Sequence, residues 1–170
     1  MSERLNYTYC QDHVRQFDRD RYLTSLFAPT DRRQDLFALY AFNHEVAKIG
    51  ALVSEELLGQ IRLQWWREAI AGIYDGAPRK HQVVEALAAT VKRHKLPRAP
   101  FDRLIDARAF DLAEEGPQTL QPWLDYAEAT SSTLTELSLL ILGVPDGPAY
   151  RAGRFVGIAW ALTGLLRVAP

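Results

Sequence analysis

The apolar residues of positions 35–66 constrain the fold most, because they recur every three or four positions. This stretch reads DLFALYAFNHEVAKIGALVSEELLGQIRLQWW. Such spacing predicts helices with a wide apolar face, and Gly50 marks a break between two of them. Apolar and polar residues do not alternate with a period of two anywhere in the sequence. The chain is therefore predicted to be all-α.

Signals for helix starts and stops divide the sequence into seven helices. Pro29 closes the first, Thr30 can cap the second, and Gly76 and Gly143 end later ones. The predicted helices comprise residues 11–27, 30–49, 54–75, 82–94, 101–115, 119–143 and 149–168. Every connection is short, and 170 residues suffice for one core, so we expect a single domain over residues 1–170.

Composition and charge argue against several classes of protein. A net charge of −1 without a basic block gives no nucleic-acid footprint. The single cysteine, Cys10, rules out an internal disulfide. The longest uncharged apolar run, residues 155–166, is shorter than the ~20 residues that span a bilayer, and the N-terminus has no secretory signal. We expect a cytoplasmic protein that can lie peripherally on the inner membrane.

Several segments resemble the squalene and phytoene synthase family. They are SLFAP, LYAFNHEV, LQWWREAI, FDRLIDARAFDL and VGIAWALTGLLR, and together they cover nearly the whole chain. The resemblance implies an all-α bundle of the isoprenoid synthase type, C-terminally incomplete because the family's later helices are missing. Active members hold Mg²⁺ ions between two aspartate-rich motifs on facing helices, and the ions bind the diphosphate of the substrate.

The resemblance fails where that chemistry should be. Ala47 and Ala51 stand at the positions of two aspartates four residues apart, and Lys48 lies between them. Val168 stands for an aspartate of the second motif, and Ala161 and Gly164 replace a glutamine and an asparagine that precede it. These departures imply no catalytic residue, no metal ligands and no cofactor. Mg²⁺ would be required only if the chain were an active synthase.

Four other residues match family positions around the central cavity and are candidates to line a pocket: Tyr40, His44, Asp111 and Arg167. We expect Tyr40, His44 and Ala47 to point toward one central cavity. His44 and Glu45 could begin a zinc motif, but no second histidine follows four residues on, so the sequence does not indicate such a motif. Pairs of aspartates at 31 and 35 and at 102 and 106 have the bare spacing of a metal motif but not its position, and solvated helix faces explain them better.

Within the family, the segments SEELLGQIRLQWWREAI, IYDGAPRKHQVVEAL and LDYAEATSSTL are similar to the branch of complex I assembly factor 6, in which the aspartate motifs have also decayed. This similarity implies a non-catalytic assembly or binding factor. Its partners would be a protein client, such as a respiratory complex subunit, and an isoprenoid or lipid ligand. The alternative is an Mg²⁺-dependent transferase that condenses two isoprenoid diphosphates.

The last predicted helix is apolar around most of its circumference, from Phe155 to Leu166. A helix of this kind requires burial on more than one side. We therefore expect this surface to self-associate or to be covered by further chain.

Overall fold

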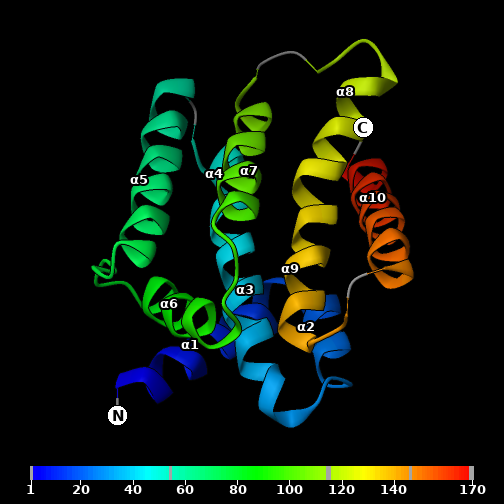
Figure 1. The fold of residues 1–170 in the computed structure, drawn as a ribbon. Coiled ribbons are helices and arrows are strands. Elements are labelled where there is room, and N and C mark those ends of the chain that lie inside the picture. Colours follow the sequence, from blue (N-terminus) through cyan, green and yellow to red (C-terminus); the bar gives the residue numbers. More distant parts are fainter. Residues whose placement is uncertain (1, 54, 114–115, 146, 169–170) are drawn as a thin grey trace.

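A computed structural model gives the chain as a bundle of helices (Figure 1). The structure describes residues 2–53, 55–113, 116–145 and 147–168, with side chains from residue 6 to residue 167. No strand occurs within these ranges, which confirms the all-α prediction. The elements are α1 (Ser2–Phe17), α2 (Arg19–Ser25), α3 (Thr30–Ala47), α4 (Ile49–Leu52), α5 (Glu56–Tyr74), α6 (Gln82–His94), α7 (Ala99–Ala107), the 3₁₀ turn η1 (Arg108–Leu112), α8 (Leu120–Ala127), the π-helical segment η2 (Glu128–Ser132), α9 (Thr133–Leu142) and α10 (Pro148–Val168).

Helix α3 lies at the centre of the bundle, where α1, α6 and α9 pack against it (Figure 1). Its aromatic residue Phe42 is fully buried and meets Trp66 of α5 and Phe101 of α7 edge-on, with ring centroids 5.5 Å apart in both pairs. Removing a side chain of this size from water contributes ~1.5–3 kcal/mol. The stretch with the strongest apolar periodicity thus forms the core helix, as predicted.

The N-terminal part differs from the predicted helix over residues 11–27. Helix α1 begins at Ser2 and ends at Phe17, and α2 starts only at Arg19. Asp18 separates them, because its carboxylate accepts hydrogen bonds from the backbone N–H of Arg21 at 3.3 Å and from Nη1 of the same residue at 2.7 Å. An aspartate in this position caps the following helix and gives it a new start.

The predicted helix over residues 119–143 is a succession of α8, η2 and α9, with π-helical hydrogen bonding from Glu128 to Ser132. Helix α10 crosses this segment at very close range. A Cβ atom added to Gly157 would lie 2.5 Å from Cα of Ser132, and one added to Gly153 would lie 2.9 Å from Cδ1 of Leu139. Gly157 therefore lets the backbone of α10 contact that of η2, and Gly153 leaves room for the side chain of Leu139.

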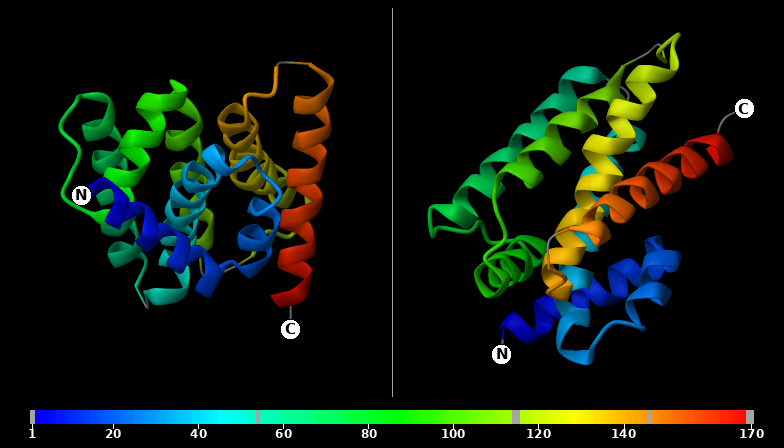
Figure 2. Two further views of the ribbon diagram at one scale, coloured as in Figure 1. Left: turned by 90° about the horizontal axis from the view of Figure 1, so that it is seen from below. Right: turned by 45° about the vertical axis from the view of Figure 1, so that its right-hand side comes forward.

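Helix α10 runs along the outside of the bundle (Figure 2). One side packs on α8, η2 and α9, whereas Phe155, Val156 and Leu166 on the other side are 64%, 60% and 77% exposed. This confirms an apolar outer face on the last helix. Within the part of the chain described here, no helix combines the length and hydropathy needed to cross a membrane.

Candidate functional site

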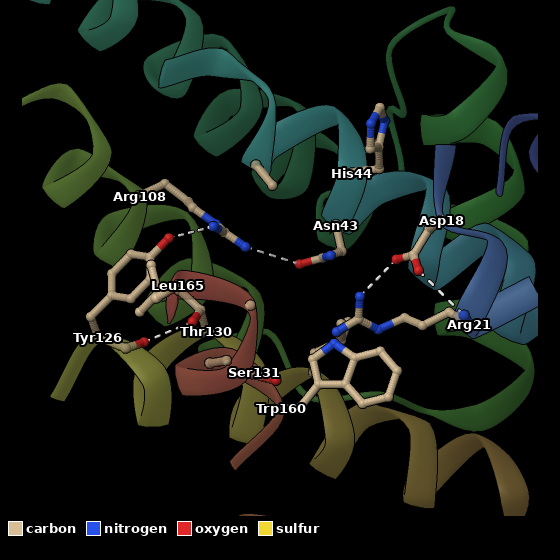
Figure 3. Close-up of a pocket in the computed structure, with 14 residues that line it drawn as sticks. Asp18, Arg21, Asn43, His44, Arg108, Tyr126, Thr130, Ser131, Trp160 and Leu165 are labelled. Atoms are coloured by element: carbon tan, nitrogen blue, oxygen red, sulfur yellow. Dashed lines mark hydrogen bonds and ion pairs between the residues drawn. The ribbon is translucent and has the colours of Figure 1, made fainter. Parts of the chain in front are cut away.

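A cavity of about 280 Å³ opens between α3 and α10, next to the start of α2 (Figure 3). Helix α3 contributes one wall through Asn43, His44 and Ala47, which lie on one turn near its C-terminal end. The opposite wall comes from the small residues of α10 and from η2. The lining residues are Asp18, Arg21, Asn43, His44, Ala47, Arg108, Tyr126, Thr130, Ser131, Leu134, Trp160, Ala161, Gly164 and Leu165.

Arg108 forms the first cationic group of the pocket. Its Nη1 donates to the hydroxyl of Tyr126 at 2.5 Å and to Oδ2 of Asp111 at 3.2 Å, and its Nη2 donates to Oδ1 of Asn43 at 3.4 Å. Its Nε is buried and has no hydrogen-bond partner among the described residues. Burial raises the pKa of Tyr126, so the phenol stays protonated at neutral pH. The guanidinium is thus held at the pocket wall, and its buried Nε–H donor has no partner among the described residues.

Arg21 forms the second cationic group, at the opposite end of the pocket (Figure 3). Its guanidinium carbon lies 5.1 Å from the ring centroid of Trp160 and 5.7 Å from that of Tyr40. Asp18 lies 2.7 Å from Nη1 of Arg21 and is the one carboxylate among the lining residues described. Asp18 therefore pairs with Arg21 and caps α2. The charged and aromatic groups that remain in the pocket walls include Arg108, Tyr126 and Trp160.

The residues singled out in the sequence occupy different places. Ala47 lies in the pocket wall. His44 also borders the pocket, but Figure 3 shows its ring pointing away from the centre. Tyr40 is not among the lining residues, and its hydroxyl shares a hydrogen bond of 3.1 Å with Oγ of Ser138. The three residues expected around one cavity are therefore only partly brought together.

Asp111 and Arg167 are not among the residues that line the pocket. Asp111 reaches the site through its ion pair with Arg108, whereas Arg167 is exposed and borders a neighbouring cavity of about 550 Å³ beside Trp160. Asp111 is also close to Gly50, where an added Cβ would lie 2.8 Å from the carbonyl oxygen of Asp111. The break predicted at Gly50 instead falls at Lys48, between α3 and α4, and Gly50 lies within α4, where its missing side chain lets α4 approach η1.

Two other degenerate motif positions, Lys48 and Ala51, are not among the lining residues of the pocket. Lys48 is one residue further around the helix than Ala47 and forms an ion pair of 2.6 Å with Glu45. Ala51 is exposed on α4. The side chain of Val168 is outside the described residues.

The donors present do not fit the Mg²⁺ ions that the family resemblance implies. Magnesium requires hard oxygen ligands, usually one or two carboxylates at close to octahedral geometry. The α3 wall offers Asn43, His44 and Ala47, and the α10 wall offers Ala161 and Gly164. With its one acid already paired to an arginine, this set cannot assemble two facing carboxylate pairs.

Arg21, Asn43, Arg108, Tyr126 and Trp160 carry the polar chemistry of the pocket, and the sequence interpretation did not single them out. Asn43 and Arg108 lie inside the segments LYAFNHEV and FDRLIDARAFDL, next to residues that it did select. The signal for Arg108 was its place three residues before Asp111, at the spacing of a helical ion pair.

Comparisons with known proteins agree with the fold and with the segments quoted from the sequence. The family model for squalene/phytoene synthase matches residues 14–170. Complex I assembly factor 6 of Homo sapiens is 35% identical over 162 residues, which cover 95% of this chain and 49% of the relative. Presqualene diphosphate synthase of Rhodopseudomonas palustris is 26% identical over 147 residues, 86% of this chain and 52% of the relative. The chain thus spans about half the length of the curated relatives it matches.

Solved structures show the same architecture. A dehydrosqualene synthase crystallised with a ligand superposes with a TM-score of 0.83 at 19% identity, covering 97% of this chain and 57% of that one. A squalene synthase from Alicyclobacillus acidocaldarius gives a TM-score of 0.82 at 24% identity, with 92% and 59% coverage. On the match to the family model and the shared all-α fold, this chain belongs to the squalene/phytoene synthase family.

Proposed function

We propose that this chain is a non-catalytic binding module that assists the assembly of a respiratory complex. The observation that carries the proposal is the composition of the pocket, where Ala47 faces Ala161 and Gly164 across the place that facing carboxylate pairs would require. The similarity to relatives named complex I assembly factor 6, at 34–36% identity in four mammals, supports the choice of client.

The pocket walls indicate the ligand class. Two guanidinium groups, Arg21 and Arg108, suit an anionic head group, because planar donors bind phosphate or carboxylate oxygens in pairs. Trp160, Leu134 and Leu165 offer apolar contacts for a chain attached to that head. We propose an isoprenoid or lipid with an anionic head as the ligand, and a location at the surface of the inner membrane, where such a ligand is available.

A second candidate is an Mg²⁺-dependent transferase that joins two isoprenoid diphosphates. The matches to presqualene diphosphate synthase and to phytoene synthase of Arabidopsis thaliana, at 26% and 24% identity, favour it. It requires metal ligands, and Asp18, the one acid among the described lining residues, is already paired with Arg21. We therefore place it second.

Three experiments separate the candidates. If the chain is a binding module, a purified assay with labelled farnesyl diphosphate and Mg²⁺ should give no product. Calorimetry should then give the same affinity for farnesyl diphosphate with and without Mg²⁺. Product that appears with Mg²⁺ and is lost in Asp18→Asn would establish the transferase. In the source organism, deletion of the coding sequence should deplete assembled complex I on native gels while the isoprenoid profile stays unchanged. The reverse pattern would contradict the assembly role.

A further inference from the structure

Three potential metal ligands meet where α1 packs against α3. Nε2 of His13 lies 2.8 Å from Nδ1 of His44 and 3.4 Å from Oε1 of Glu45. The three ligand atoms all lie within 4.8 Å of one another. The side chains of His13 and Glu45 are only 6% and 14% exposed, so the cluster is nearly closed to solvent. His13 and His44 are 31 residues apart in the sequence and come from different helices. No local spacing in the sequence therefore reveals this group of potential ligands.

Two imidazoles and one carboxylate form a donor set typical of first-row transition metals. Zinc–nitrogen bonds of ~2.0–2.1 Å at tetrahedral angles place neighbouring donor atoms roughly 3.3–3.5 Å apart. The contact between His13 and Glu45 already has this separation. The contact between His13 and His44 must open by roughly 0.5 Å to reach it.

The contact between the two rings already provides a free lone pair. Nε2 of His13 and Nδ1 of His44 lie 2.8 Å apart, so at least one of these nitrogens accepts a hydrogen bond. In this contact of 2.8 Å, the N–H group of one ring donates a hydrogen bond to the nitrogen of the other. When an ion enters, that proton moves to the second nitrogen of the same ring, and both facing nitrogens become ligands without net proton release.

One cation opposes the ion. Lys48 donates to Oε1 of Glu45 at 2.6 Å, the same oxygen that faces His13. Its side chain is 32% exposed, so it can rotate into solvent when an ion replaces it. Phe17 stacks on His44 with ring centroids 4.9 Å apart and fixes the orientation of that ring. The carboxylate side of the cluster can therefore adjust by releasing Lys48.

We propose that His13, His44 and Glu45 bind one divalent transition-metal ion of the zinc class, with water in the fourth position. The site is independent of the proposed function, because it uses the side of His44 that faces away from the pocket. Bound metal would tie α1 to the core helix α3.

Zn²⁺ titration of the chain by calorimetry tests the proposal, with Co²⁺ absorption as a second readout. We expect one Zn²⁺ per chain and visible Co²⁺ bands of a four-coordinate nitrogen and oxygen site. His13→Gln and His44→Gln should each weaken Zn²⁺ binding more than roughly 100-fold, since loss of an outer-shell partner alone costs 10–100-fold. Glu45→Gln should weaken it by at least ~10-fold.

Lys48→Met provides the sharper test, because it removes the competing cation and leaves all three ligands. It should tighten Zn²⁺ binding by roughly 3- to 10-fold, the equivalent of one partly exposed ion pair. Glu56→Gln, an exposed acid in the first turn of α5, is the matched control and should change nothing.

Circular dichroism in chelator checks that each variant folds. If His13→Gln does not fold, Glu45→Gln and Lys48→Met still decide, because neither removes a fully buried side chain. If no Zn²⁺ binds at about 0.1 mM, the proposal is overturned; a Kd of this value corresponds to a binding free energy of ~5.5 kcal/mol. Binding that is insensitive to Glu45→Gln and Lys48→Met overturns it as well.

Discussion

Oδ2 of Asp35 on α3 lies 2.8 Å from Nε2 of His94 on α6, and the aspartate is fully buried instead of lying on the solvated helix face expected from the sequence. Its other oxygen, Oδ1, accepts hydrogen bonds from Nη1 of Arg93 at 2.6 Å and from the hydroxyls of Tyr7 and Thr90 at 3.0 Å. Tyr7 belongs to α1, so one carboxylate links three helices. A charge buried without such partners would be strongly unfavourable.

We predict that Asp35→Asn lowers the free energy of unfolding by ~3–5 kcal/mol, because it leaves the buried donors without their charged acceptor. Urea denaturation at pH 7 measures this change. Asp31→Asn, one helical turn earlier and exposed, is the control and should stay within ~0.5 kcal/mol of the parent. A loss of similar size in both variants would show that the network has no special role.

The same carboxylate predicts an acid dependence of stability. Burial by itself would raise the pKa of Asp35, but hydrogen bonds from His94, Arg93 and Thr90 outweigh it and hold the pKa below the usual 3.8. A lowered folded-state pKa contributes stability that is complete above the unfolded value of ~3.9 and is lost as the pH falls through the folded value. The difference between the parent and Asp35→Asn in urea unfolding should therefore be constant from about pH 7 to 5 and shrink below about pH 4. A difference that grows on acidification would refute this.

Gly157 and Gly164 form a matched pair on α10. Gly157→Ala should cost ~1–3 kcal/mol, because its new Cβ would meet the backbone of Ser132. Gly164→Ala should stabilise the protein by up to ~1 kcal/mol, since nothing lies within 4 Å of its Cβ and alanine favours a helix. Thermal unfolding of both variants compares them directly. Equal effects would place the close crossing of α10 and η2 in doubt.

Adding a single carboxylate should not restore metal-dependent binding. Ala47→Asp puts an acid into the α3 wall, yet Ala161 and Gly164 still offer no facing ligand. We expect calorimetry with geranylgeranyl diphosphate to show no gain on adding Mg²⁺, because the metals would lack half of their coordination. Ala51→Asp, on the exposed surface of α4, is the control. Mg²⁺-dependent binding in Ala47→Asp alone would show that the pocket is closer to an active site than we propose.

The outer face of α10 predicts association of the 170-residue chain with itself. Phe155, Val156 and Leu166 forgo ~1.5–3 kcal/mol each by remaining in water. Sedimentation velocity should show oligomers that increase with concentration, and Phe155→Lys with Leu166→Lys should give a monomer. Ile61→Lys on α5, where the native side chain is 57% exposed, is the control and should leave association intact. A concentration-independent monomer that binds no hydrophobic dye would mean that this face does not drive association.

Helix positions and the core helix could be predicted because they depend on local spacing. The apolar residues of α3 recur with the period of a helix, and the structure buries them. The break at Asp18 was missed, because an aspartate in a charged helical stretch looks like one more solvated residue. Only its hydrogen bonds to Arg21 reveal the cap.

The candidate site was less predictable, because its polar residues come from separate helices. Arg108 and Tyr126 meet across 18 residues, and His13 meets His44 across 31. Neither pair follows from a motif within one helix. Family position identified the wall of the pocket at Ala47 but could not show that the hydroxyl of Tyr40 is engaged by Ser138.

The shape of the pocket depends on the number of residues in the π-helical segment η2. Tyr126 lies before the segment and Leu134 after it, and both line the same cavity. A π-helical turn uses i→i+5 hydrogen bonds and so holds more residues than an α-helical turn. Deleting one residue between Glu128 and Ser132 would let this segment return to α geometry and would change how Tyr126 faces Arg108. The backbone of η2 also contacts α10 at Gly157, so the length of this segment sets two walls of the pocket at once, and no point substitution alters it.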